Sequence, residues 1–63
     1  MPNIYESNNK YYIQENDKFI LCNVMIKRNA IVLMKSDIVE NEIENYKIYT
    51  YKELKNKLTK REE

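Results

Sequence analysis

The chain has 63 residues and a formal net charge of +1, and it contains no histidine, no glycine and a single cysteine. Catalysis near neutral pH commonly uses histidine for proton transfer, an activated thiol as nucleophile, and glycine where the backbone approaches phosphate. One thiol allows no internal disulfide and, without histidine, disfavours a zinc site. The composition therefore argues against an enzyme, a bound metal or a cofactor, and the balanced charge is unlike that of a dedicated nucleic-acid module.

A chain of this length forms one domain, residues 1–63, and buries too little surface to be very stable alone. Small domains without a disulfide or metal often gain stability from a second copy or a partner, so we expect a host protein partner or a homodimer. No apolar run approaches the roughly 18 residues of a membrane span. The polar start does not resemble a signal peptide, and we expect a cytoplasmic protein.

The first half of the sequence predicts strands. Residues 1–9 are polar and should fray, as should 60–63, although Ile4 and Tyr5 have the character of a short edge strand. Three later segments are rich in aromatic and β-branched residues and are separated by polar turns. They span residues 10–14, 19–27 and 30–35. The last two are apolar on both faces, which indicates a hairpin whose second face is covered by a helix or another chain.

Without glycine, turn positions with positive φ fall to asparagine or aspartate. We assign this role to Asn16, Asp17 and Asn29, which lie between the predicted strands. Arg28-Asn29 is a poor match to the Asn-Gly type of two-residue turn, so we expect a longer loop there.

The second half predicts one firm helix. Ser36 and Asp37 precede Glu40 in a capping-box pattern, which suggests either a short helix or an acidic loop up to residue 45. A strand is expected over 46–50. Thr50 and Glu53 form a second capping box, and the apolar positions after it predict an amphipathic helix over 51–60.

The most unusual feature of the composition is its content of six tyrosines. Alternation places Tyr11 and Tyr12 on opposite faces of their strand, and likewise Tyr46 and Tyr49. Exposed tyrosines are favoured at protein interfaces, and the acidic segment Asp37 to Glu44 suits a basic partner surface. The candidate partner-binding residues are Tyr11, Tyr12, Tyr46, Tyr49, Asp37, Glu40, Glu42 and Glu44.

Other interpretations of the same residues stay open. The tyrosines also suit half-buried strand positions, or base stacking beside lysines. The acidic segment also suits a solvated face, whereas a calcium loop would need glycine and a ligand spacing that it lacks. Cys22 lies in the most apolar run and is expected to act as a small hydrophobic residue with a raised thiol pKa.

The sequence thus predicts an α+β fold, with a small three- to four-stranded antiparallel sheet and a C-terminal helix packed on one face. The predicted function is a small non-enzymatic protein-binding module, a phage- or plasmid-encoded inhibitor or modulator that acts stoichiometrically on a host protein. The sequence is rich in Asn, Ile, Lys and Tyr, whose codons are AT-rich, and this composition suggests a phage or plasmid origin. The alternative is a small nucleic-acid-binding regulator that uses sheet tyrosines and lysines.

Overall fold

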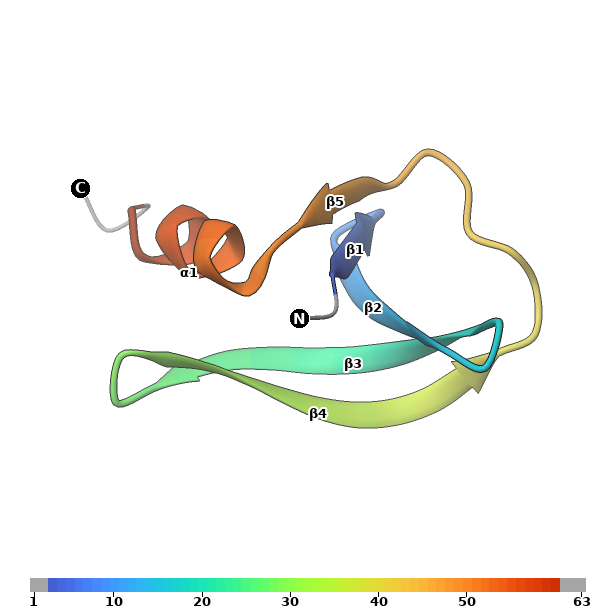
Figure 1. Ribbon diagram of the computed structural model, residues 1–63, viewed down its shortest axis with the longest axis horizontal. Helices are drawn as coiled ribbons and strands as arrows, with labels where there is room; N and C mark the ends of the chain where they lie inside the picture. Colours follow the sequence, from blue (N-terminus) through green and yellow to red (C-terminus); the bar gives the residue numbers. More distant parts are fainter. Residues whose placement is uncertain (1–2, 61–63) are drawn as a thin grey trace.

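A computed structural model describes residues 3–60 and shows five strands followed by one helix (Figure 1). The elements are β1 (Ile4–Ser7), β2 (Lys10–Glu15), β3 (Lys18–Lys27), β4 (Ala30–Val39), β5 (Lys47–Tyr49) and α1 (Tyr51–Lys60). The predicted α+β class and antiparallel sheet are confirmed, although the described residues form five strands where three or four were expected. No helix in this part of the chain is long and apolar enough to cross a membrane.

The strands form one antiparallel sheet in the order β4-β3-β2-β1-β5. The first four strands follow one another as a meander, and β5 returns from the far edge to pair with β1. The strand expected at Ile4 and Tyr5 is present as β1, but its expected edge position was wrong, because Tyr5 pairs with Tyr12 on one side and Ile48 on the other. Part of the segment 1–9 expected to fray is therefore an interior strand, while residues 1–2 and 61–63 lie outside the described residues.

Each of the three hairpin turns has two residues, and both residues of each turn have positive φ. They are Asn8-Asn9, Asn16-Asp17 and Arg28-Asn29, with φ between 50° and 66°. The predicted positive φ of Asn16, Asp17 and Asn29 is confirmed. The longer loop expected at Arg28-Asn29 was wrong, because Lys27 pairs directly with Ala30 and Arg28 itself adopts the left-handed conformation. Twisted strands favour this compact turn even where its residues are not ideal.

Strand β4 continues to Val39, so the helix start suggested at Ser36 and Asp37 was wrong. The first residues of β3 need a partner strand on the side away from β2. Phe19 and Ile20 therefore pair with Val39 and Ile38. The register skips Ser36, which forms a bulge. The segment beyond Val39 is a loop that leads to β5, which agrees with the acidic loop predicted as the alternative to a short helix.

The core lies on the inner face of the sheet, the face against which α1 packs. Ile13, Ile20 and Cys22 are buried there against Leu33. Ile4 and Leu54 are completely buried. Burial raises the pKa of the Cys22 thiol, as expected for a thiol that serves as a small apolar side chain. Helix α1 packs against β5 and β4, the two edge strands of the sheet, and so spans its open side (Figure 1).

Helix α1 begins with the predicted capping box. The Glu53 amide donates to Thr50 Oγ1 at 3.1 Å, and the Thr50 amide donates to Glu53 Oε1 at 2.9 Å. These reciprocal bonds satisfy backbone donors that have no partner within the helix. They fix the point at which the chain leaves β5 and turns into α1.

We expect Thr50→Ala to lower the free energy of unfolding by about 1 kcal/mol, the usual effect of losing an N-cap side chain. Urea denaturation followed by circular dichroism measures this loss. Lys52→Ala is the matched control, because Lys52 is exposed in the same helical turn and takes no part in the capping box. Equal effects of the two substitutions would contradict the capping role.

Candidate acidic-aromatic interface

An aromatic cluster lies on the outer face of the sheet, which points away from α1. The Tyr5 ring meets the rings of Phe19 and Tyr46 edge to face, with centroids 5.2 and 5.1 Å apart. Tyr12 contacts Phe19 in the same manner at 6.5 Å. Edge-to-face pairs are a favoured arrangement of aromatic rings. The cluster therefore forms an ordered apolar surface instead of four isolated side chains.

The sheet register explains why these rings meet. Tyr5 is directly opposite Tyr12, and Tyr12 is opposite Leu21 on β3. Residues opposite each other in an antiparallel pair share a face, and side chains along β3 alternate. Phe19 is thus on the same face as Leu21, one step from Tyr12. Tyr46 reaches this face from the loop just before β5 and is 41% exposed.

The loop over residues 40–46 brings three carboxylates to the edge of this cluster. Ser7 Oγ donates to the Glu44 carbonyl at 3.2 Å, which ties the loop to β1. Ile43 is half-buried, whereas Glu40, Glu42 and Glu44 are exposed. The Ser7 bond thus places the loop, and with it the three carboxylates, beside the aromatic rings.

Two shallow hollows flank the loop. One, of about 410 Å³, is lined by Tyr12, Val39, Glu42 and Glu44 among others. The other, of about 220 Å³, is lined by Phe19, Val39, Glu40 and Glu42, and also by Asp17 and Lys18 at the β2–β3 turn. Each hollow thus combines an aromatic ring with carboxylates. We call the surface that contains both the acidic-aromatic surface; it comprises Tyr12, Phe19, Asp37, Glu40, Glu42, Glu44 and Tyr46.

The structure places six of the eight candidate residues on this one side of the molecule. Asp37 lies on the outer face opposite Leu21, next to Val39, and its Oδ1 accepts from the Ile38 amide at 3.0 Å. Tyr12 and Tyr46 belong to the aromatic cluster, and the three glutamates to the loop. Tyr11 and Tyr49 lie on the inner face, opposite Glu6 and Ile4, and are half-buried.

Sequence reasoning missed Tyr5 and Phe19, which hold the aromatic cluster together. The outward position of Phe19 could have been predicted from the alternation within β3, since Phe19 shares a face with Leu21 and Met25. For Tyr5 there was no such signal, because its place in the cluster depends on the pairing of β1 with β2 and on the loop that brings Tyr46 to it.

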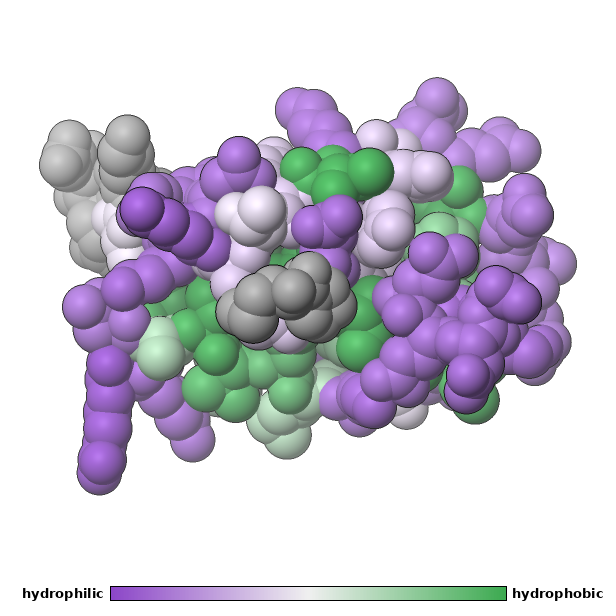
Figure 2. Space-filling view, in the orientation of Figure 1, coloured by the Kyte–Doolittle hydropathy of each residue, from purple (hydrophilic) through white to green (hydrophobic). Residues whose placement is uncertain are grey.

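Charge on this surface is mostly uncompensated. Glu40 accepts from Lys18 at 3.4 Å, but both side chains are well exposed and water screens such a pair. Among the described side chains, no lysine or arginine lies within 4 Å of the Glu42 or Glu44 carboxylate. Figure 2 shows mainly hydrophilic side chains at this end of the molecule, where the loop and the β2–β3 turn lie in Figure 1.

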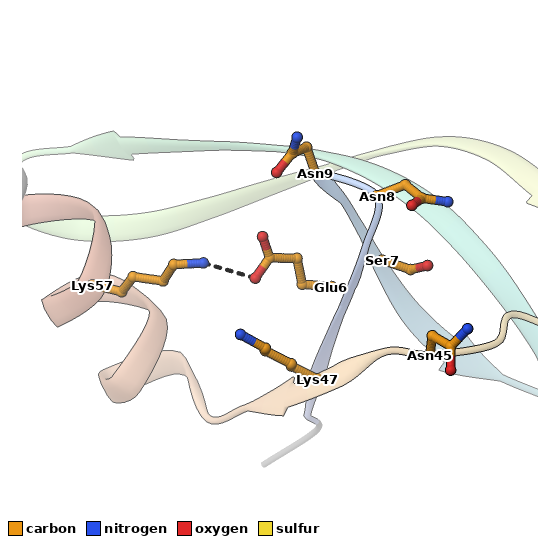
Figure 3. Close-up of a pocket in the computed structure, with 7 residues that line it drawn as sticks. All are labelled: Glu6, Ser7, Asn8, Asn9, Asn45, Lys47 and Lys57. Atoms are coloured by element: carbon orange, nitrogen blue, oxygen red, sulfur yellow. Dashed lines mark hydrogen bonds and ion pairs between the residues drawn. The ribbon is translucent and has the colours of Figure 1, made fainter.

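A further cavity, of about 190 Å³, lies at the other side of β1 and is lined by polar residues (Figure 3). Within it, Lys57 Nζ donates to Glu6 Oε1 at 2.7 Å and also lies 5.0 Å from the centre of the Tyr49 ring. The bond to Glu6 raises the pKa of Lys57. The Glu6–Lys57 pair joins α1 to β1, which is a structural role, and Lys47 of β5 is a third charged residue in the lining.

Residues 3–60 contain no group of three or more histidine, cysteine, aspartate or glutamate side chains arranged to hold a metal ion. Comparisons with models of protein families, with curated proteins and with solved structures found no match to this chain. Inference about function therefore rests on the surface chemistry alone.

Proposed function

We propose that this chain is a small non-enzymatic protein-binding module, which docks through its acidic-aromatic surface onto a basic surface of a host protein and modulates it stoichiometrically. The observation that carries the proposal is the meeting of exposed carboxylates with aromatic rings in the same two hollows. Arginine and lysine side chains suit such hollows, because a carboxylate attracts their charge and an aromatic ring can form a cation–π contact with them.

The same chemistry favours a protein over a nucleic acid. Glu42 and Glu44 lie beside Tyr12, so a phosphate backbone near that ring would meet two negative charges. Tyrosine is also among the residue types enriched at protein interfaces. A phage- or plasmid-encoded modulator of a host factor would be one biological setting for such a module.

An oligoarginine peptide serves as a probe of the proposed surface. We expect the wild-type protein to bind it, and Glu42→Gln with Glu44→Gln to weaken binding about tenfold, since two charge contacts are lost. Isothermal titration calorimetry measures both affinities. A loss of affinity with added salt is expected as well.

The matched control is Asn56→Lys with Thr59→Lys, which changes the net charge by the same amount on α1, at the opposite end of the molecule (Figure 1). This control should bind the peptide nearly as the wild type does, because charges separated by more than about 10 Å are largely screened at ordinary ionic strength. Equal weakening by both double variants would overturn the proposal, as would an absence of binding by the wild type.

A further inference from the structure

The outer face of β3 and β4 carries an apolar stripe that continues from the acidic-aromatic surface. It consists of Leu21, Met25, Val32 and Met34. Met25 is directly opposite Val32, and Met34 is opposite Asn23, so all lie on the same face as Phe19. Met25 and Met34 are 37% and 52% exposed.

A bulge keeps this stripe and the acidic residues on one face. Along β4 the register omits Ser36, so Met34 and Asp37 both point outward although they are three residues apart. The outer face therefore changes along its length from acidic and aromatic at Phe19 to apolar and methionine-rich at Met25. Six residue steps of about 3.3 Å separate these two residues, a span of roughly 20 Å.

From this arrangement we infer that the docking segment of the partner is a basic amphipathic helix. Its arginine or lysine side chains contact the acidic-aromatic surface, and its apolar side chains contact the methionine stripe. This inference rests on the proposed function and specifies its partner. A helix of about 13 residues has the required length of roughly 20 Å.

The sheet itself argues for a helical partner. Both neighbours of β3 are paired with it, so the backbone groups of β3 are used within the sheet. A segment that lies on the face of the sheet finds no backbone partners there and must satisfy its own amides and carbonyls. An α-helix does so internally. Methionine side chains adapt to varied apolar surfaces, which suits a helix packed along the face of β3.

The test uses two peptides of identical composition, one with leucines and arginines segregated on opposite faces of a helix and one with the order scrambled. We expect the wild-type protein to bind the amphipathic peptide about tenfold more tightly, with a gain of helical circular dichroism in the peptide. Met25→Gln with Met34→Gln should abolish this preference while leaving the affinity for oligoarginine unchanged.

Ile38→Gln is the matched control. Ile38 is exposed to a similar degree, at 54%, but it is opposite Ile20 and so belongs to the inner face. It should keep the preference for the amphipathic peptide. Equal affinity of the wild type for both peptides, without a gain in helicity, overturns the helical partner but leaves the proposed function standing, whereas failure to bind oligoarginine overturns both. A wild-type dimer that the methionine double variant converts to a monomer in light scattering also overturns the inference, because a second copy would then cover the stripe.

Discussion

Leu54→Ala is expected to leave the protein largely unfolded in the absence of a partner. Leu54 is completely buried and belongs to α1, which spans the open side of the sheet. Truncation of a buried leucine typically costs about 2–5 kcal/mol. A single core in a domain below about 70 residues rarely supplies more than about 3–5 kcal/mol in total. The expected loss therefore approaches the whole stability of the fold.

Urea denaturation followed by circular dichroism measures this effect. Leu54→Met is the matched control, because it keeps the side-chain volume and should cost less than about 1.5 kcal/mol. A Leu54→Ala protein with the unfolding midpoint of the wild type would show that α1 does not complete the core.

Lys57→Met is expected to lower the free energy of unfolding by about 1–3 kcal/mol, towards the lower end of that range. The Glu6 side chain is only 14% exposed, so removal of the ammonium group leaves a mostly buried carboxylate without its ion pair. Lys57 itself is 43% exposed, and solvent screening limits the effect. The methionine preserves much of the packing of the lysine stem.

Lys18→Met is the control for an exposed ion pair, since the side chains of Lys18 and Glu40 are 54% and 78% exposed. It should cost less than about 1 kcal/mol. Because the bond to Glu6 raises the pKa of Lys57, the stabilisation by that pair is complete below the ordinary lysine pKa of 10.5 and is lost as the pH rises through the raised value. Equal losses from Lys57→Met and Lys18→Met would contradict the distinction between these pairs.

Local features of this fold were accessible from sequence because local chemistry determines them. The reciprocal bonds of Thr50 and Glu53 follow from a pattern of four residues. The positive φ of Asn16, Asp17 and Asn29 follows from the absence of glycine between apolar strands. The opposite faces of Tyr11 and Tyr12 follow from strand alternation.

Strand pairing between residues far apart in the chain could not be predicted from the sequence. Ile4 and Tyr5 carry no mark of an interior strand, because their second neighbour is β5, more than 40 positions later in the chain. The capping pattern at Asp37 was misleading, since the pairing of Val39 with Phe19 outweighs a local preference for a helix start. The candidate surface was predictable as a set of residue types, but its assembly depends on the loop that Ser7 holds against β1.

The central claim is that the acidic-aromatic surface binds basic side chains, and nuclear magnetic resonance titration of the isotope-labelled protein with oligoarginine tests it most directly. We expect the largest shift changes at Tyr12, Glu42, Glu44 and Tyr46, with little change at Lys55 and Asn56 on α1. Shift changes centred on α1, or spread evenly over the whole surface, would contradict the account.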